Sequence, residues 1–397
     1  MNTQQLSLIK ATVPILKEHG VTLTKHFYQR MFTHNPELKN QFNMGNQASG
    51  KQQTALATAV LAYAEHIENP GVLIGALKSI GQKHVSLNIT AEQYAIVGGH
   101  LIASIKEVLQ DGATDELLEA WTIAYNQLAQ IMIDLEAGMY KENREKKGGW
   151  NGWRTFVISR IVEESTEIKS FYLTPKDQQP IATYHPGQYL TVKTYVDTLG
   201  HEQPRQYSLS SAFNENFYRI TVKKENPTDL PAGIVSNNLH DKKQGNEIEV
   251  SVPAGLFHIG DRPNQPLILI SGGVGITPMM SMLETQAVKD NKIVWLHSCR
   301  NEKVQAFKNE IEHYSTNFDN VTAYTFFNEI EQETEFKRNG FLDLKTLKED
   351  VILPEAQYYI CGPTPFIQVQ FETLKNLGVA QEAIFYEEFG PQLLNLN

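Results

Sequence analysis

A histidine lies within an apolar stripe in the first third of the chain. Leu73, Leu77, Ile80, His84 and Leu87 follow one another at spacings of four, three, four and three residues. This spacing predicts one buried face of a helix. An imidazole on that face needs a polar partner. A core histidine bonded to a backbone carbonyl is the commoner outcome, and a metal ligand is the alternative.

A glycine-rich turn between a strand and a helix is a second candidate site. The apolar run Leu267–Ile270 leads directly into Ser271–Met280. Glycines let the backbone approach a pyrophosphate, and the following helix dipole favours the anion. The turn departs from the Gly-x-Gly-x-x-Gly fingerprint, so a tight connection without a ligand is the alternative. We expect Thr277 to cap the helix and Pro278 to take its first position. The candidate binding residues are Gly272, Gly273, Val274, Gly275, Thr277 and Pro278.

Three short motifs follow one another in the middle of the chain. Pro186–Tyr189 comes first, Arg205–Ser208 second and Gly233–Asn237 third. Each motif alone has an ordinary explanation, such as a surface ion pair, a strand aromatic or a turn. Their joint occurrence favours a common function. Two further motifs, Cys361–Pro363 and Tyr386–Pro391, lie near the end of the chain. Cys361 is equally well explained as a small buried residue.

The elements that must position these residues change in character twice along the chain. From residue 6 to 140 the apolar residues recur every three or four positions, which predicts helices. The charged run 141–149 ends in two glycines and predicts a helix end and a linker. Short alternating stretches then predict an antiparallel β-barrel. They are residues 155–161, 170–173, 189–195, 218–223 and 247–252.

The last third has a different pattern again. Residues 267–270, 292–296 and 357–361 read as fully buried strands with helical segments between them. This order predicts an α/β domain with a doubly wound parallel sheet. We therefore expect three domains, spanning residues 1–147, 150–262 and 263–397.

The composition excludes several classes of protein. Of the 397 residues, 41% are apolar and 20% are charged, which is ordinary for globular domains. The net charge of -10 argues against nucleic acid or an anionic membrane as the main partner. Cys299 and Cys361 lack metal-type spacing, so a disulfide framework and a zinc site are both improbable. With no signal peptide and no membrane-length apolar run, we expect a cytoplasmic protein without stable membrane insertion.

The first third resembles the globin domain of the flavohaemoglobins. The resemblance rests on Tyr28–Leu38 and on the residues that follow it, Phe42, Gln52 and Leu56. It implies that His84 is the proximal ligand of haem iron and that Phe42 packs on the porphyrin. Tyr28, Gln52 and Leu56 would then line the distal side. Helical periodicity alone would allow Gln53 in place of Gln52, and only the ungapped match from Phe42 selects Gln52.

The resemblance also places Tyr94 and Glu136 behind the proximal histidine. A carboxylate that accepts the second N–H of the histidine raises electron donation to iron, which favours oxygen activation over storage. On the distal side, a tyrosine hydroxyl and a glutamine amide can donate hydrogen bonds to negative charge on oxygen. From the residues alone, a core Tyr94 and a solvated Glu136 are equally plausible, and Tyr28 is more often an ordinary helix aromatic.

The middle motifs are similar to the FAD domain of the ferredoxin-reductase type. The resemblance implies that Tyr207 packs on the isoalloxazine ring and that Ser208 hydrogen-bonds near its reactive nitrogen. Arg205 would neutralise the pyrophosphate, and Tyr189 would contact the flavin or its adenine. Backbone N–H groups at a helix start would bind the phosphates. The remaining residues of this predicted site are Gln206, Gly233, Val235 and Ser236.

The C-terminal motifs complete the resemblance. Cys361, Gly362 and Pro363 would lie beside the nicotinamide, and Glu387 and Phe389 would lie against the flavin. The sequence departs from the family where Glu388 replaces a common Cys and Gly273 replaces a common Ala. The second carboxylate leaves the assignment of Glu387 open. Arg300 is either a ribose-phosphate contact or a surface arginine.

The resemblance covers nearly the whole chain and implies one function. It predicts a nitric oxide dioxygenase that carries haem b and FAD and uses NAD(P)H. Its partners would be O2, NO and NAD(P)H, with a lipid in the haem pocket as a further candidate, and we expect a monomer. The alternatives are a reductase of lipid hydroperoxides or quinones and a gas-binding globin sensor.

Overall fold

The structure is a computed structural model that describes residues 1–226, 233–260, 265–330 and 332–390. The chain divides into two compact units, residues 1–153 with 193–205 and residues 154–192 with 206 onward. The predicted domain boundary at residues 262 and 263 lies outside the described residues. The predicted limits of the three domains stay predictions.

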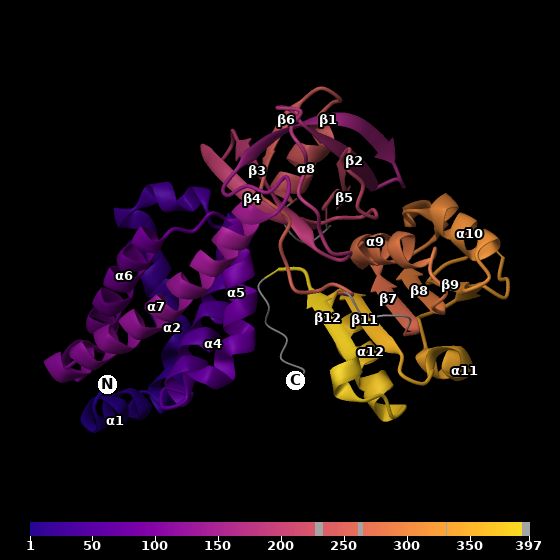
Figure 1. The fold of residues 1–397 in the computed structure, drawn as a ribbon. Coiled ribbons are helices and arrows are strands. Elements are labelled where there is room, and N and C mark those ends of the chain that lie inside the picture. The colour runs from indigo at the N-terminus through magenta and orange to yellow at the C-terminus, as the bar shows by residue number, and fades with distance from the viewer. Residues whose placement is uncertain (227–232, 261–264, 331, 391–397) are drawn as a thin grey trace. The chain divides into compact units, whose positions relative to one another are not determined.

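The first unit consists mainly of helices, as the spacing of its apolar residues predicts (Figure 1). The helices are α1 (Thr3–Ala11), α2 (Val13–His34), α3 (Met44–Ala48), α4 (Lys51–Glu65), α5 (Ile74–Ser86), α6 (Ala91–Leu109) and α7 (Asp115–Glu145). Polar residues fix where several of them begin. The Thr114 side chain accepts from the Leu117 N–H at the start of α7, and Thr90 and Gln93 form a capping box at α6.

The helical core is apolar and closely packed. Phe27 and Met31 of α2 meet Tyr63 of α4 and Trp121 of α7 in one buried cluster. A Cβ atom on Gly98 would lie 2.3 Å from the ring of Tyr125, so α6 and α7 approach closely only because this residue is glycine. The charged run after residue 140 is largely helical, because α7 continues to Glu145.

The middle of the chain forms an antiparallel six-stranded sheet. Its strands are β1 (Arg154–Glu163), β2 (Ile168–Pro175), β3 (Tyr189–Val196), β4 (His201–Ser208), β5 (Tyr218–Lys223) and β6 (Glu247–Val250). The strand order is β4-β3-β6-β1-β2-β5, and α8 (Ile234–Asp241) follows β5. A bridge between Leu209, just after β4, and Ile220 of β5 joins the two ends of this order. The predicted antiparallel barrel is thereby confirmed.

One strand was not among the stretches predicted from the sequence. It is β4, which begins at His201 and contains the motif Arg205–Ser208. Pro204 therefore lies inside a strand. It is tolerated because β4 is at the end of the strand order, where proline's missing N–H costs no ladder bond on the open side.

The last third forms a fully parallel sheet, as predicted. Its strands are β7 (Leu267–Gly272), β8 (Ile293–Cys299), β9 (Val321–Phe327), β10 (Lys337–Asn339), β11 (Gln357–Gly362) and β12 (Ile384–Glu388). They pair in the order β10-β9-β8-β7-β11-β12. The helices are α9 (Ile276–Gln286), α10 (Lys308–Asn317), α11 (Lys348–Val351) and α12 (Thr364–Asn376).

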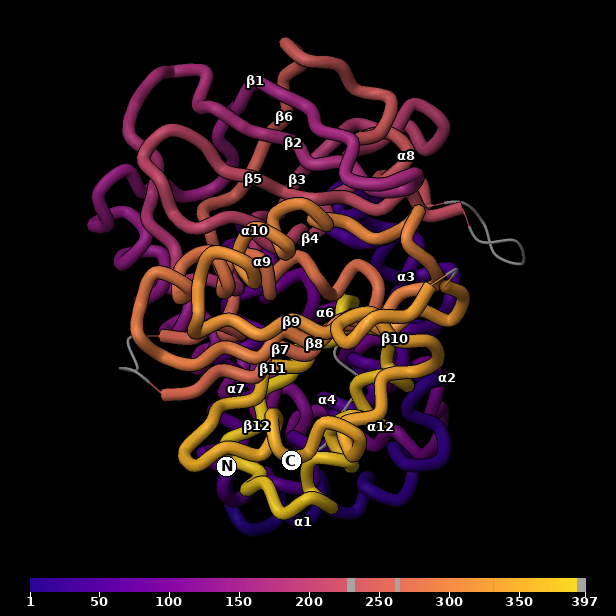
Figure 2. The backbone as a smooth tube through the Cα atoms, turned by 90° about the vertical axis from the view of Figure 1, so that its right-hand side faces the viewer, coloured from indigo at the N-terminus to yellow at the C-terminus, as the bar shows by residue number. Residues whose placement is uncertain are grey.

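Helices cover both faces of this parallel sheet (Figures 1 and 2). Leu267 and Leu269 point into the cluster that contains α9 and α10 residues. Their neighbours Ile268 and Ile270 point into the cluster that contains α12 residues. Alternate residues of β7 thus pack against the helices on opposite faces of the sheet, which explains why the strand is apolar throughout.

A buried ion pair joins the antiparallel sheet to α9 within the second unit. The Arg219 guanidinium on β5 lies 2.7 Å from the Glu284 carboxylate, and both side chains are largely buried. Glu284 also accepts the Ala212 N–H at 2.8 Å. Ser281 donates to the Ser211 carbonyl at 2.7 Å. The two sheets of this unit are therefore locked together by specific polar contacts.

A hairpin segment of the antiparallel sheet belongs to the helical unit. It comprises residues 193–205, between the ends of β3 and β4. The Glu202 N–H donates to Asn40 Oδ1 at 2.8 Å. The fully buried Gln203 accepts the Met44 N–H at 3.1 Å and donates to the Phe42 carbonyl at 3.2 Å. These bonds fix the segment between α2 and α4.

Candidate functional site

His84 lies near the end of α5, and its Nδ1 atom is held by two groups. Glu136 Oε1 is 2.8 Å away and the Tyr94 hydroxyl oxygen is 2.9 Å away. The Tyr94 hydroxyl donates to the same Glu136 oxygen at 2.6 Å. Because a carboxylate only accepts, Nδ1 carries the hydrogen. The Nε2 lone pair is then the one that can bind a metal.

The carboxylate at the centre of this triad is buried. Glu136 is only 3% exposed. This burial excludes the alternative interpretation that Glu136 is a solvated residue on the helix surface. Burial, and then the Glu136 carboxylate, raise the pKa of Tyr94 far above its usual range. The hydroxyl therefore stays protonated and keeps donating to Glu136. The structure brings His84, Tyr94 and Glu136 together from α5, α6 and α7.

Tyr28, the predicted distal tyrosine, is a buried residue of the helical core. It lies on α2, is 5% exposed, and meets the ring of Phe42 edge-on with centroids 5.7 Å apart. Burial raises the pKa of Tyr28, while hydrogen bonds from Gln52 and Gln47 act in the opposite direction. Gln53 is turned away and donates to the Gln47 carbonyl at 3.1 Å. Gln53 is thus bound to Gln47, while the assignment of Gln52 to the distal side stays a prediction.

The residues present fit a haem group. The histidine tautomer is fixed with Nε2 available, which suits iron. Phe42 and Leu56 are partly buried at the edge of the apolar cluster that contains Tyr28. An apolar enclosure with one imidazole and few polar groups is the usual environment of haem in a globin.

The flavin motif lies at the end of β4. Ser208 is buried, and the Gln206 amide donates to Thr191 Oγ1 at 3.3 Å. The Arg205 guanidinium donates to the Pro204 carbonyl at 2.7 Å. Tyr189 begins β3, and its ring packs against Gly255, where a Cβ atom would come within 2.9 Å. Tyr207 is partly buried on the same strand as Arg205.

The predicted phosphate-binding helix start is present. Gly233 is the N-cap of α8, and Val235 and Ser236 are buried in its first turn. The Ser236 hydroxyl donates to the Gly233 carbonyl at 3.0 Å. A Cβ atom on Gly233 would lie 2.6 Å from Ser236 Oγ, so only glycine fits. A glycine-started helix of this kind presents free N–H groups and a positive dipole end to an anion.

The glycine-rich turn differs from the prediction where it enters the helix. Gly273, Val274 and Gly275 form a 3₁₀ turn that continues directly into α9. The helix therefore begins at Ile276, with Gly275 as its N-cap already in helical conformation. Thr277 is not the cap. It lies inside the first turn, where its hydroxyl donates to the Val274 carbonyl at 3.1 Å, and Pro278 follows at the third helical position rather than the first.

The two glycines of this turn are required for different reasons. A Cβ atom on Gly275 would lie 2.2 Å from the Cys361 carbonyl oxygen, which explains why glycine stands there. Gly273 has a φ of 53° and faces open space. The turn and the loop Cys361–Pro363 thus adjoin at the carboxyl edge of the sheet, as expected at a nucleotide site. Gly272 packs against the ring of Phe366.

The C-terminal strand places its acidic residues beside this loop. In β12, Glu387 pairs in register with Cys361, and Glu388 pairs with Gly362. Glu388 accepts a hydrogen bond from the Thr364 hydroxyl at 2.5 Å. Cys361 is fully buried, and burial raises the pKa of its thiol well above the usual range. Phe389 is 44% exposed. Of the C-terminal motif, Pro391 lies outside the described residues.

Arg300 has a protein partner. Its guanidinium forms an ion pair with Glu167 on the turn between β1 and β2, although the arginine side chain is largely exposed. This contact favours the surface-arginine interpretation over a ribose-phosphate contact.

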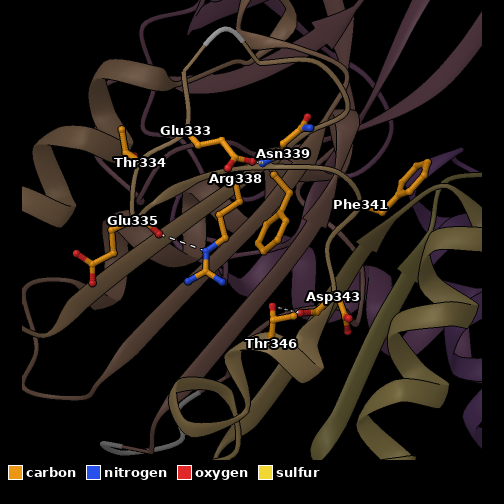
Figure 3. A pocket seen from close by; sticks show the side chains of 9 residues that line it. Glu333, Thr334, Glu335, Arg338, Asn339, Phe341, Asp343 and Thr346 are labelled. Carbon is orange, nitrogen blue, oxygen red and sulfur yellow. Dashed lines mark hydrogen bonds between the residues drawn. The ribbon is translucent and has the colours of Figure 1, made fainter.

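A separate pocket of about 390 Å³ opens at the outer edge of the parallel sheet (Figure 3). Arg338 and Asn339 of β10, Phe326 of β9 and the exposed Phe341 are among the residues that line it. The Arg338 Nε donates to the Glu335 carbonyl at 3.3 Å. None of the predicted site residues lines this pocket.

Two residues near the candidate sites were missed from the sequence. Gln47 lies in α3, whose five residues are too few to show a helical period, and Gln203 lies near the start of β4, outside the stretches predicted as strands. A buried polar residue outside a periodic stretch gives no signal of this kind. None of the described helices is long and apolar enough to cross a membrane.

Three family models match successive parts of the chain. They are Globin at residues 25–132, the Oxidoreductase FAD-binding domain at 155–259 and the Oxidoreductase NAD-binding domain at 269–371. The flavohemoprotein of Bordetella pertussis is 47% identical over 392 residues and matches 97% of both chains. The flavohemoprotein of Rhizobium meliloti is 45% identical over 393 residues, again 97% of both chains.

Solved structures agree with these matches. A flavohemoglobin from Malassezia yamatoensis with bound FAD and heme aligns with a TM-score of 0.86 at 26% identity, covering 98% of this chain and 99% of that one. The FAD/NAD-binding domain of a nitric oxide dioxygenase from Vibrio cholerae aligns with a TM-score of 0.55 at 34% identity, covering 60% of this chain and 99% of that one. The chain thus combines a haem-binding globin domain with FAD-binding and NAD-binding oxidoreductase domains. It belongs to the flavohemoprotein family.

Proposed function

We propose that this flavohemoprotein is an NAD(P)H-dependent nitric oxide dioxygenase. In the balanced reaction, two molecules of NO and two of O2 give two nitrate ions, while one NAD(P)H is oxidised to NAD(P)⁺ and one proton is released. The observation that carries the proposal is the His84–Glu136–Tyr94 triad with its buried carboxylate, in a chain that also has its own flavin and nucleotide domains. The Vibrio cholerae relative, whose FAD/NAD-binding domain is 34% identical to this chain, is named a nitric oxide dioxygenase.

When bound, FAD and haem would supply the redox chemistry that no side chain can perform, because a flavin can accept the two electrons of one hydride and release them one at a time. The task of His84 is to present Nε2 as a strongly donating ligand. The Glu136 carboxylate accepts its Nδ1–H at 2.8 Å and so increases the electron density on the imidazole. Tyr94 holds the carboxylate in place through its own hydrogen bond. This arrangement favours oxygen chemistry over simple gas storage.

Tyr28 is the proposed hydrogen-bond donor on the distal side. Burial raises the pKa of its hydroxyl, so at neutral pH the group is protonated. A protonated phenol can donate to negative charge that develops on oxygen. Gln52 would line the same side as a second hydrogen-bond donor.

The flavin and nucleotide residues have binding roles in this proposal. Tyr189 and Arg205–Ser208 would hold the flavin, with the N-terminus of α8 at its phosphates. The turn at Gly272–Gly275 would bind the pyrophosphate of NAD(P)H, and Cys361–Pro363 would lie beside the nicotinamide. We also propose a cytoplasmic location, because both cysteines are buried, unpaired thiols that suit a reducing compartment. The monomeric state stays a prediction.

Single-turnover spectroscopy of the purified protein tests the proposal. The protein is reduced anaerobically with NADH or NADPH, and oxygen and then NO are added while haem and flavin spectra and nitrate are followed. We expect flavin and haem to be reduced in turn and nitrate to form in a 2:1 ratio to the nicotinamide consumed. Negligible steady-state turnover, or faster turnover with lipid hydroperoxides or quinones than with NO, would contradict the proposal.

A further inference from the structure

A short segment follows the flavin motif and is attached to the antiparallel sheet at its start. It comprises residues 209–212 and comes directly after Ser208, which ends β4. The Leu209 N–H donates to the Gln188 carbonyl at 2.8 Å. Gln188 belongs to the motif Pro186–Tyr189, which is also predicted to contact the flavin. The start of the segment is therefore fixed to both strands that would hold the flavin ring.

The other half of the same segment is bound to α9. The Ser211 carbonyl accepts from the Ser281 hydroxyl at 2.7 Å, and the Ala212 N–H donates to Glu284 Oε2 at 2.8 Å. Ser281 and Glu284 are three residues apart, so they lie on the same face of the helix. The helix continues without a break from the turn Gly273–Gly275, the predicted pyrophosphate site. One segment thus joins the elements that would hold the two reactants.

The Glu284 carboxylate is held through both of its oxygens. Oε2 accepts from Ala212, and Oε1 lies 2.7 Å from the Arg219 guanidinium. Arg219 is itself fixed, because it donates to the Ser210 hydroxyl and carbonyl and lies 5.1 Å from the centre of the Phe307 ring. The side chains of Arg219 and Glu284 are only 6% and 16% exposed. A buried ion pair with this many hydrogen bonds is a directional contact that permits little movement.

We propose that Glu284 is a positioning residue for hydride transfer, which fixes the nucleotide turn at the start of α9 relative to the flavin strand β4. This inference rests on the proposed function, in which NAD(P)H reduces FAD. In that step the C4–H bond of the dihydronicotinamide breaks, and the hydrogen leaves with both electrons. It forms a bond to the reactive nitrogen of the flavin, which leaves NAD(P)⁺ and the reduced flavin anion. A misplacement of about 1 Å can slow such a step by about a hundredfold.

A second contact between the same two sheets provides a matched control. Glu167, between β1 and β2, pairs with Arg300, and the neighbouring Thr166 N–H donates to the Lys303 carbonyl at 3.1 Å. The Arg300 side chain is 63% exposed, and exposed ion pairs contribute little to stability. This contact includes no residue of the flavin motifs or of the glycine-rich turn. Glu167→Gln therefore makes the same chemical change as Glu284→Gln, at a contact that attaches neither reactant.

The test compares these two variants in the full protein loaded with FAD and haem. Glutamine fills the same volume as glutamate but has one acceptor oxygen, so it cannot keep the contacts of Glu284 with both Arg219 and Ala212. Anaerobic stopped-flow absorbance with NADH gives the limiting rate of flavin reduction and the apparent Kd for NADH. Hydrogen–deuterium exchange of peptides that contain residues 209–212 is measured without nucleotide, so it does not depend on activity.

We expect Glu284→Gln to lower the limiting rate of flavin reduction by about 10- to 100-fold. The apparent Kd for NADH should change by less than about threefold, because the turn that binds the nucleotide keeps all its residues. Exchange at residues 209–212 should be faster, since the Ala212 N–H loses its acceptor. Glu167→Gln should stay within about twofold of the original limiting rate. Equal limiting rates in the two variants, or a weaker Kd with an unchanged limiting rate, would overturn the proposal.

Nitrate formation separates this proposal from the proposed function. If Glu284→Gln slows flavin reduction but the original protein forms no nitrate from NO and oxygen, the dioxygenase function fails and the positioning role stands. If the original protein forms nitrate but Glu284→Gln reduces its flavin at the original limiting rate, the positioning role fails alone.

A second variant covers the case in which Glu284→Gln does not fold because the buried Arg219 has lost its counter-charge. Ser281→Ala removes the other link between α9 and the segment and leaves the ion pair in place. The Ser211 carbonyl keeps the Tyr184 hydroxyl as a donor at 2.7 Å, so no buried acceptor is left without a partner. The limiting rate of flavin reduction should fall by about two- to tenfold. An unchanged limiting rate in Ser281→Ala would contradict the proposal independently.

Discussion

Replacing Glu136 by glutamine tests how the proximal triad controls the iron. The Glu136 carboxylate accepts from His84 Nδ1 at 2.8 Å and from Tyr94 at 2.6 Å, in an environment where it is 3% exposed. An amide oxygen at the same place accepts more weakly. The imidazole then donates less electron density, so the ferric state is stabilised less and the reduction potential of the haem should rise.

The magnitude follows from the type of hydrogen bond that is lost. A hydrogen bond to a charged group contributes about 1.5–3 kcal/mol and a neutral one about 0.5–1.5 kcal/mol. The charged bond therefore exceeds the neutral one by about 1–1.5 kcal/mol. If this difference is lost from the ferric state alone, the potential rises by about 45–65 mV for a one-electron couple. A spectroelectrochemical titration of the Soret band measures this shift.

Tyr94→Phe is the control, because it should move the potential in the opposite direction. The Tyr94 hydroxyl donates to Glu136 and takes up part of the carboxylate charge. Without it the carboxylate accepts more strongly from His84, and the potential should fall slightly. A potential that falls in Glu136→Gln, or shifts by less than about 15 mV, would refute the reasoning.

Two further predictions concern the parallel-sheet domain. Gly275→Ala should slow flavin reduction by NAD(P)H at least about tenfold while FAD stays bound, because its Cβ atom would lie 2.2 Å from the Cys361 carbonyl oxygen and displace the turn. Stopped-flow flavin absorbance measures this rate, and an unchanged rate would show that the turn does not bind the nucleotide. His297 is fully enclosed beside Ser271, and burial lowers its pKa to about 3. The unfolded state therefore binds a proton below about pH 6.5 that the folded state refuses, so stability falls from about pH 6.5 towards pH 3 by about 1.4 kcal/mol per pH unit. Denaturant titrations across this range should show a shallower fall in His297→Gln, and equal slopes would contradict this account.

The parts of the fold that could be predicted are those with a regular period. The apolar spacing around His84 predicted α5, and the continuous apolar run at 267–270 predicted a buried parallel strand. The start of α9 was predicted wrongly, because the 3₁₀ turn at Gly273–Gly275 already supplies the first helical conformation. Cap rules assume that a chain enters a helix from an extended residue, and here it does not.

The candidate site was predictable only where a family motif supplied what periodicity could not. Glu136 lies on a helix of 31 residues, and its position along that helix does not reveal that it faces α5. Its burial depends on how α5 and α7 pack, which is a tertiary property. Gln47 lies in a helix of five residues and Gln203 near the start of β4, and neither position belongs to a periodic stretch or a recognised motif. Their bonds to backbone groups became visible only in three dimensions.

His84→Ala is the most direct test of the central claim, that iron is bound through the imidazole at this position. The purified variant is examined by visible spectroscopy and then mixed anaerobically with NADH. We expect the Soret band of the bound haem to be lost while the flavin is still reduced at the original rate. A variant that keeps a normal Soret band, or that loses flavin reduction together with the haem, would contradict the account.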